Sequence, residues 1–288
     1  MIPAAFSYAR PTSIAEALDL LAAGQGTTKV LAGGQSLLPL LRLRLARAEQ
    51  LVDIGGLTEL RAIRAMPDGG VSIGALATYT EVLESDLATS RVPLLAMTIP
   101  GIGDVQVRNR GTLGGGIAHA DPASDMPAVV LALDARLVLR SRSGERVVAA
   151  GDFFEGAFAT DCAEDELLTE IRIPAQPAGA GMAFRRLEQK ASSYSIVGVA
   201  AVVGRTAGSV TTARIGITGV SDHAYRASGV EAALIGTNGD DAAVASAAAH
   251  ASDGITPSSD IHADGTYRAE MARVETRRAI EAALAAAD

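Results

Sequence analysis

The predicted fold rests first on the stretch Arg110-Gly111-Thr112-Leu113-Gly114-Gly115-Gly116-Ile117-Ala118-His119-Ala120-Asp121-Pro122. Its three successive glycines follow a short apolar segment, Val105 to Val107, that is predicted to be a strand. Glycine has no side chain and tolerates positive φ, so consecutive backbone N–H groups can curl around one anion. The hydroxyl of Thr112 adds a further donor. The stretch therefore predicts an anion-binding turn.

A second stretch of the same character is Val30-Leu31-Ala32-Gly33-Gly34-Gln35-Ser36. Ser36 is placed to cap the helix predicted after it, and helix N-termini attract phosphate. Taken alone, a Gly-Gly pair at a strand exit is more often an ordinary tight turn. Two such turns together could hold the two phosphates of a dinucleotide from opposite sides, so the pair carries the prediction.

The common nucleotide-binding motifs do not account for these turns. The chain has no G-x-x-x-x-G-K-[ST] sequence, and Gly101-Ile102-Gly103-Asp104-Val105-Gln106 lacks the last glycine of a Rossmann turn. A different fold with paired glycine turns is therefore favoured.

Composition limits the classes of protein that the chain can represent. Its 288 residues, 48% hydrophobic and 20% charged, suit one large globular domain or two moderate ones. A net charge of −8 argues against nucleic-acid binding. The single cysteine, Cys162, excludes an internal disulfide and an all-cysteine iron–sulfur site. No membrane-length apolar run or signal-peptide pattern is recognised, so the predicted location is cytoplasmic.

The pattern of apolar residues predicts three successive units. The first, about residues 1–55, and the second, about 56–176, are α/β units, and residues 177–288 form an α+β module. The proline- and glycine-rich connection at 175–181 is the predicted domain boundary. The predicted strands are 29–32, 50–54, 60–65, 71–75, 136–140, 146–149, 166–173, 182–187, 196–203 and 210–218, and the predicted helices are about 12–21, 36–45, 80–86, 93–98, 124–133, 227–235, 241–251 and 267–286.

Few residues are candidates for catalysis. Of the four histidines, three are predicted on surface turns or helix faces, and only His119 adjoins the central glycine stretch. Asp121 and Asp125 could form a metal pair, but Asp121-Pro122 is typical of a turn and Ser124-Asp125 of a helix start. Cys162 is predicted in a polar loop. No Ser-His-Asp arrangement can be argued from spacing.

The two glycine stretches resemble a known family. Ala32-Gly33-Gly34-Gln35-Ser36 and Thr112-Leu113-Gly114-Gly115-Gly116 are similar to the two FAD diphosphate loops in the flavin subunit of the molybdenum hydroxylases. That family includes the medium subunits of aerobic carbon monoxide dehydrogenases and the FAD subunits of xanthine dehydrogenases. The resemblance extends from Ile2-Pro3 to the last predicted helix.

The resemblance implies an α+β fold in two parts. Residues 1–176 would form an FAD-binding domain of the vanillyl-alcohol oxidase and p-cresol methylhydroxylase type, built from two α/β subdomains (about 1–55 and 56–176). Residues 177–288 would form a C-terminal domain of three antiparallel strands and a helical bundle, as in carbon monoxide dehydrogenase flavoproteins.

The resemblance also implies which residues contact FAD, with no catalytic or metal-binding residue on this chain. Asp125 matches an acid that hydrogen-bonds the cofactor, and Leu168 matches a backbone contact near the adenine. Arg186 and Tyr194 match positions near the flavin ring, although from the residues alone they would be a strand-surface charge and a core aromatic. The predicted set is Ala32, Gly33, Gly34, Gln35, Ser36, Ile102, Gly103, Thr112, Leu113, Gly114, Gly115, Gly116, Ala118, Asp125, Leu168, Arg186 and Tyr194.

Some positions depart from the family pattern. Gly116 stands where many relatives carry asparagine, Gln35 replaces a histidine, Ser193 replaces an acid and Arg186 replaces a lysine. These changes are expected to affect the flavin potential or the choice of acceptor, whereas none of them removes the diphosphate loops.

The function implied by the resemblance is electron transfer within a larger complex. FAD would bind non-covalently, and [2Fe–2S] clusters and a molybdenum cofactor would lie on a small and a large partner subunit. The substrate contacts would then lie on another chain. The expected assembly is a dimer of heterotrimers that passes electrons through FAD to an external acceptor. Two alternatives remain: a stand-alone flavin oxidase or reductase of the same fold, and a non-enzymatic nucleotide-binding module.

Overall fold

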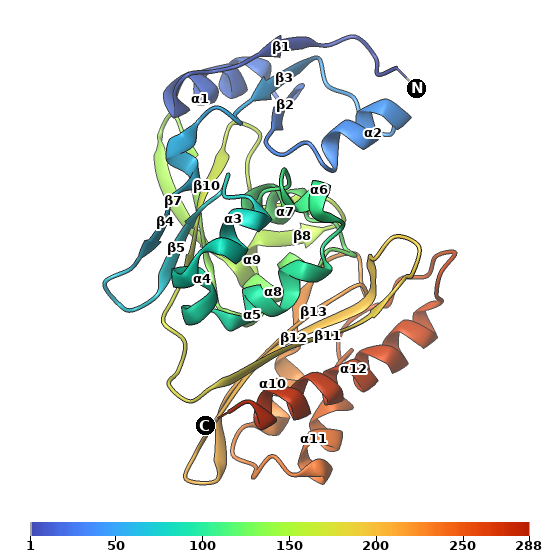
Figure 1. The fold of residues 1–288 in the computed structure, drawn as a ribbon. Coiled ribbons are helices and arrows are strands. Elements are labelled where there is room, and N and C mark those ends of the chain that lie inside the picture. The colour runs from blue at the N-terminus through green and yellow to red at the C-terminus, as the bar shows by residue number, and fades with distance from the viewer. Residues whose placement is uncertain (1, 288) are drawn as a thin grey trace.

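The computed structural model describes residues 2–287 as three layers of secondary structure (Figure 1). A small sheet with two helices lies at the N-terminal end, and a five-stranded sheet with short helices forms the middle layer. A four-stranded sheet with three helices forms the far end of the molecule. This arrangement matches the predicted α+β class. None of the helices within residues 2–287 combines the length and the apolar character that crossing a bilayer requires.

The first layer is a parallel sheet in the order β1-β3-β2. Helix α1 packs on it through Ala17, Leu18 and Leu21, and is capped by Ser13, whose hydroxyl accepts the N–H of Glu16. The first glycine loop leaves the carboxyl end of β2, which is the end where open α/β sheets bind ligands. The elements are β1 (Ser7–Ala9), α1 (Ile14–Gly24), β2 (Thr28–Leu31), α2 (Leu37–Leu43) and β3 (Gln50–Asp53).

The second layer is a sheet in the order β4-β5-β10-β6-β7, in which neighbouring strands are antiparallel. Its buried face and the helices beside it share one apolar core with part of the third layer. The elements are the 3₁₀ turns η1 (Thr58–Arg61) and η2 (Ile99–Gly101), the strands β4 (Ile63–Ala65), β5 (Val71–Gly74), β6 (Arg136–Ser141), β7 (Gly144–Ala149), β8 (Phe154–Gly156), β9 (Ala159–Thr160) and β10 (Leu167–Ile173), and the helices α3 (Tyr79–Glu84), α4 (Asp86–Arg91), α5 (Pro93–Thr98), α6 (Val105–Arg108), α7 (Leu113–His119), α8 (Asp125–Ala132) and α9 (Ala150–Phe153).

The third layer is an antiparallel sheet in the order β11-β12-β13-β14, with α12 packed along β11 and β12. Helix α8 of the middle layer packs on its other face, where Gly216 allows a close approach: a methyl group there would lie 2.1 Å from the Ala128 carbonyl oxygen. The elements are β11 (Gly181–Glu188), β12 (Ser195–Thr206), β13 (Ser209–Thr218), β14 (Tyr225–Arg226), α10 (Ser228–Leu234), α11 (Asp241–Ala248) and α12 (Gly265–Ala285).

The structure differs from the sequence-based elements in several places, and β1, α4, α7, α9, β8 and β9 were not predicted at all. Val105 to Val107, predicted as a strand, begin helix α6, because the Asp104 carboxylate accepts the N–H of Val107 at 2.8 Å and so caps a helical turn. Ser36 precedes α2 but makes no side-chain cap, since its own backbone is already helical. The last sheet contains a short fourth strand, β14, in addition to the three predicted.

Candidate functional site

The two glycine loops lie directly against each other. Gly33 packs on the backbone of the second loop so closely that a methyl group there would lie 2.2 Å from the Arg110 carbonyl oxygen. A methyl group on Gly115 would lie 3.7 Å from Cβ of Ala32. The structure therefore brings together two stretches that are about 80 residues apart in the sequence, as the pair of turns predicted.

The first loop exposes a row of backbone donors. Within residues 2–287, the N–H groups of the five residues from Ala32 to Ser36 have no hydrogen-bond acceptor. Gly34 adopts a left-handed conformation with φ +75°, which turns the loop back on itself. Successive backbone N–H groups around such a turn form a concave site for an anion. This loop fits a phosphate group of FAD.

The second loop is built differently from the prediction. The N–H groups of residues 113–116 already donate within the chain, at 2.9 Å or 3.0 Å, to the acceptors Ala77 O, Ala75 O, Thr112 Oγ1 and Thr112 O respectively. They form the first turn of α7, for which Thr112 is the cap. Only the N–H of Thr112 itself lacks an acceptor within residues 2–287. The expected row of glycine donors is thus replaced by one N–H and the Thr112 hydroxyl.

Two glycines of the second loop, Gly114 and Gly116, instead allow helix α7 to pack closely on the middle layer. A methyl group on Gly114 would lie 2.4 Å from Cβ of Ala75, at the end of β5. A methyl group on Gly116 would lie 2.2 Å from Oη of Tyr79, at the start of α3. Both glycines therefore seat α7 against the middle layer, and this holds Thr112 beside the first loop.

A cavity of about 110 Å³ lies where the loops meet. Its walls include three arginines, Arg10, Arg61 and Arg110, and one acid, Asp53. The two Asp53 oxygens accept hydrogen bonds from Gly55 N at 2.9 Å and from Tyr8 Oη at 2.6 Å. These donors within the chain partly compensate the negative charge of Asp53. The remaining lining is Ala32, Gly33, Gly55, Leu76, Thr78, Asn109 and Thr112. The excess of cations favours an anionic group at this place.

A buried ion pair connects the second and third layers near the loops. Asp125, only 5% exposed, accepts hydrogen bonds from Ser195 Oγ at 2.6 Å and from Arg186 at 2.7 Å. Burial raises the pKa of Asp125, and the bonds from Ser195 and Arg186 oppose that shift. Arg186 also pairs with Glu188. Each carboxylate oxygen has a second lone pair, so Asp125 retains the capacity to accept a bond from a cofactor.

The segment around Ile102 and Gly103 borders this ion pair. Arg108 fixes the segment by donating to the carbonyl oxygens of Ile102 and Gly103 at 3.1 Å and 2.9 Å. The guanidinium of Arg186 lies against Gly101, where a methyl group would be 2.9 Å from the nearest nitrogen. The predicted residues Ile102, Gly103, Asp125 and Arg186 thus belong to one neighbourhood.

Three other predicted residues have different surroundings. Tyr194 is 47% exposed in the loop between β11 and β12, so it is a surface aromatic and not a core one. Ala118 is exposed on α7. Leu168 is buried on β10 within the core of the middle layer, so only its backbone could reach a ligand.

Sequence reasoning missed Tyr79 and Ser195, and noted Arg108 only as a cation close to the central glycine stretch. Tyr79 fills the space beside Gly116, Ser195 holds Asp125 and Arg108 fixes the segment at 102–103. Ser195 lies 70 positions from Asp125, and no local pattern joins the two. Of the three, only Arg108 had a signal, because it lies close to the glycine stretch.

His119 and Cys162, the remaining candidates for chemistry, lie in surroundings that do not favour a reactive role. His119 packs on Phe158 with ring centroids 5.1 Å apart, and burial lowers its pKa. Cys162 is half-buried, and burial raises the pKa of its thiol to about 12, which disfavours the reactive thiolate. Within residues 2–287 no group of three His, Cys, Asp or Glu side chains is placed to hold a metal ion.

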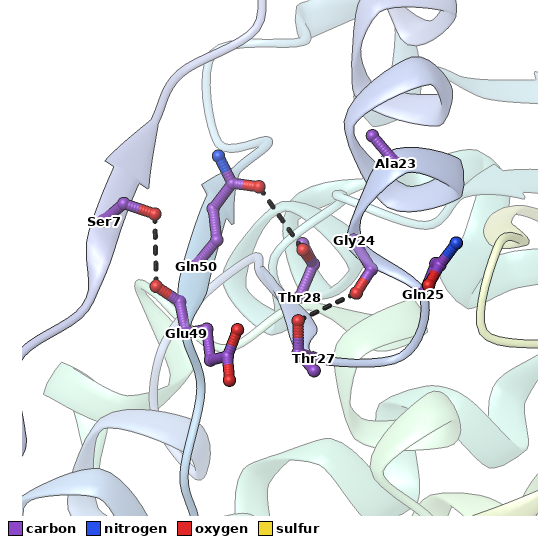
Figure 2. A pocket seen from close by; sticks show the side chains of 8 residues that line it. All are labelled: Ser7, Ala23, Gly24, Gln25, Thr27, Thr28, Glu49 and Gln50. Carbon is purple, nitrogen blue, oxygen red and sulfur yellow. Dashed lines mark hydrogen bonds between the residues drawn. The ribbon is translucent and has the colours of Figure 1, made fainter.

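A pocket of about 550 Å³ lies away from the glycine loops (Figure 2). It is found at the amino ends of β2 and β3, and Figure 2 shows Ser7, Thr28 and Gln50 around it. Four of its polar side chains bond to one another or to nearby carbonyls: Thr28 donates to Gln50 at 3.3 Å, and Ser7 and Thr27 donate to backbone carbonyl oxygens. The loop from Ala32 to Ser36 leaves the opposite end of β2, so this pocket is separate from the site described above.

Comparison with known proteins gives consistent matches along the chain. Residues 4–176 match the family "FAD binding domain in molybdopterin dehydrogenase", and residues 182–283 match "CO dehydrogenase flavoprotein C-terminal domain". The glyceraldehyde dehydrogenase medium chain of Sulfolobus acidocaldarius is 41% identical over 98% of this chain and 99% of its own. The carbon monoxide dehydrogenase medium chain of Hydrogenophaga pseudoflava is 40% identical over 99% of both.

A solved structure shows the same arrangement. The carbon monoxide dehydrogenase from Hydrogenophaga pseudoflava that lacks the Mo-pyranopterin moiety of the molybdenum cofactor superimposes with a TM-score of 0.97 at 41% identity, covering 100% of both chains. The likeness therefore extends through all three layers and is not limited to the glycine loops.

Proposed function

Because the chain belongs to the family of FAD-binding domains of molybdopterin dehydrogenases, we propose that it is the FAD-carrying medium subunit of a heteromeric molybdenum hydroxylase. It is an oxidoreductase subunit of the flavoprotein type. In the proposed complex, electrons pass from [2Fe–2S] clusters on a small subunit through FAD to an external acceptor, and the molybdenum cofactor lies on a large subunit. The observation that carries the proposal is the row of unpaired N–H groups from Ala32 to Ser36 beside Thr112.

The residues of this chain bind and orient FAD in the proposal. The loop from Ala32 to Ser36 donates to the diphosphate, and Thr112 adds its N–H and hydroxyl from the facing loop. Asp125, Arg186 and the segment at 102–103 border the flavin end, with Tyr194 at the surface. When bound, FAD supplies the redox chemistry, and the protein supplies position and electrostatics. Binding is non-covalent, since neither His119 nor the half-buried Cys162 is one of the residues that form this site.

The proposal divides the chain into an FAD-binding domain at 1–176, with subdomains of about 1–55 and 56–176, and a C-terminal domain at 177–288. The three sheets support this division, because each is confined to one of these segments. FAD would bind between the two subdomains, where Gly33 and Arg110 meet. A cytoplasmic location and a dimer of heterotrimers stay predictions.

A surface next to the first loop is suited to a partner subunit. Helix α2 and the residues after it expose three leucines, Leu38, Leu43 and Leu45, by 40%, 54% and 73%. Arg42, Arg44 and Arg47 stand among them, and none forms an ion pair within residues 2–287. Exposed apolar patches with arginine are typical of protein interfaces. The surface therefore fits a partner that presents apolar and acidic side chains.

The experiment has two parts. The purified chain is precipitated with acid and the supernatant is analysed by chromatography: we expect one FAD per chain in the supernatant. The chain is then co-expressed with the products of the neighbouring genes, and we expect it to co-purify with an iron–sulfur protein and a molybdenum protein. Flavin that stays in the pellet contradicts non-covalent binding. A chain that remains alone and reduces its flavin with an organic substrate supports the stand-alone oxidase instead.

A further inference from the structure

Tyr79 lies against the second glycine loop. It is the first residue of α3, is 5% exposed, and its N–H donates to the Gly111 carbonyl at 3.0 Å. One edge of its ring packs on Gly111, where a methyl group would lie 3.2 Å away. Its Oη occupies the space beside Gly116, at 2.2 Å from the place of a methyl group there. Both contacts fix the ring, so the hydroxyl has one position.

The ring of Tyr79 is buried and its hydroxyl donates to no acceptor within residues 2–287, but the hydroxyl oxygen is not fully enclosed by protein. A tyrosine whose ring is buried usually gives its hydroxyl a hydrogen-bond partner. Tyr225, which is 8% exposed in the third layer, follows this rule and donates to the Ala251 carbonyl at 2.9 Å. Burial, and after it the charges of Asp125 and Tyr194, raise the pKa of Tyr79, so its hydroxyl stays protonated and remains a donor. A donor that is held in place and borders open space beside the second glycine loop is available to a ligand bound there.

The position of the hydroxyl indicates which part of the ligand it meets. Gly116 is next to Gly115 and one helical turn beyond Thr112, which together belong to the diphosphate loop. The hydroxyl thus stands beside the residues assigned to the diphosphate.

We propose that Tyr79 is a cofactor-binding residue whose hydroxyl donates a hydrogen bond to FAD beside the second glycine loop. Gly116 is the steric counterpart of Tyr79: position 116 has no side chain because Oη of Tyr79 fills that volume. The pair therefore supplies from α3 a polar contact that a side chain on α7 would otherwise make. This inference rests on the proposed function, since it requires that FAD is the ligand.

The first test removes only the hydroxyl. Tyr79→Phe is expected to weaken FAD binding to the apo chain about three- to tenfold, the range for one neutral hydrogen bond, measured by calorimetric titration. The unfolding temperature of the apo chain is expected to stay unchanged, because the hydroxyl makes no bond within the chain. Tyr225→Phe is the matched control: it breaks a bond inside the protein, so it should lower the unfolding temperature and leave FAD affinity unchanged.

The second test uses the steric pair. Gly116→Ala should weaken FAD binding and lower the unfolding temperature, because its methyl group meets Oη of Tyr79 at 2.2 Å. In the Tyr79→Phe background the same methyl group would face only the ring carbon Cζ, at 3.5 Å, which is an ordinary contact. Gly116→Ala should therefore cost less in the double variant than in the wild type. Tyr79→Phe with Gly116→Ser should regain part of the FAD affinity, since the new hydroxyl replaces the lost donor.

The outcomes separate this inference from the proposed function. Failure of the wild-type chain to bind FAD overturns the proposed function and this inference with it. Wild-type binding together with unchanged affinity in Tyr79→Phe overturns the inference alone. A Tyr79→Phe variant that loses apo stability as Tyr225→Phe does, with no change in FAD affinity, identifies a purely structural tyrosine and also overturns it.

Discussion

The α-carbon of Gly33 lies so close to the backbone of Arg110 that a methyl group at position 33 would stand 2.2 Å from the Arg110 carbonyl oxygen. This contact joins the first layer to the second at the point where the two glycine loops meet. Both partners of the contact are backbone atoms, so neither can move aside as a flexible side chain would. The spacing of the two loops, and hence the width of the proposed diphosphate site, depends on it.

Gly33→Ala is expected to push the two loops apart. We expect FAD affinity to fall at least tenfold, because donors on the two loops could no longer reach one diphosphate together. The apo chain should also lose stability by about 2 kcal/mol, which is typical of overpacking at a buried contact. Titration with FAD and thermal unfolding measure the two effects. Gly151→Ala is the control, since a methyl group there meets nothing within 4 Å; equal effects of the two variants would refute the loop contact.

Thr112→Val is expected to disturb the second loop through its cap. The Oγ1 of Thr112 accepts the N–H of Gly115 at 3.0 Å, and loss of such a cap costs about 1 kcal/mol. The same change removes a hydroxyl assigned to the diphosphate, so FAD affinity should also fall. Thr112→Ser keeps the oxygen and should retain both properties. If Thr112→Val binds FAD as tightly as Thr112→Ser, the hydroxyl does not contact the cofactor.

Arg186→Met is expected to make stability depend more strongly on pH. Burial already raises the pKa of Asp125, and loss of Arg186 removes one of the bonds that oppose this. A carboxyl group whose folded-state pKa is raised stabilises the fold below its unfolded pKa, and this contribution is lost as pH rises through the folded pKa. The loss relative to wild type should therefore grow from acidic to alkaline pH, reaching about 3 kcal/mol.

Thermal unfolding across that pH range measures this effect. Asp125→Asn combined with Arg186→Met removes both charges, so the double variant should recover much of the stability lost at alkaline pH. A loss that is the same at every pH would show that Arg186 stabilises the protein by packing and not through the charge of Asp125.

Leu43→Glu tests the exposed surface of α2. The change places a negative charge among Arg42, Arg44 and Arg47, and the partner is expected to be acidic there, so association with the iron–sulfur subunit should weaken at least tenfold. FAD content should not change. Val147→Glu is the control, because Val147 is 46% exposed on β7, the edge strand at the far side of the middle sheet. Equal association by both variants would place the interface elsewhere.

Much of the fold could be predicted because local patterns determine it. Pro93–Thr98 was predicted with the bounds that α5 has, since proline begins it and Pro100-Gly101 follows it. The prediction of a strand at Val105 to Val107 was wrong. The two β-branched valines indicated a strand, whereas the Asp104 cap stabilises a helical turn there. Short segments of this kind depend on one or two hydrogen bonds, which apolar spacing does not reveal.

The site was predicted less completely than the fold. The glycines identified both loops, but only the structure shows that the N–H groups of residues 113–116 are used inside the chain and those of residues 32–36 are not. The roles of Tyr79 and Ser195 depend on contacts with residues far away in the sequence, Gly116 and Asp125. Such pairs follow from the packing of layers, which a single sequence does not specify.

The measurement that tests the central claim most directly follows the flavin absorbance during anaerobic mixing with the substrate of the complex. In the assembled complex, we expect the substrate to bleach the flavin band of this chain, because electrons arrive through the partner clusters. The FAD-loaded chain alone should keep its full absorbance with the same substrate, yet lose it with an artificial reductant. Bleaching of the isolated chain by the substrate, or an unchanged flavin in the active complex, would contradict the account.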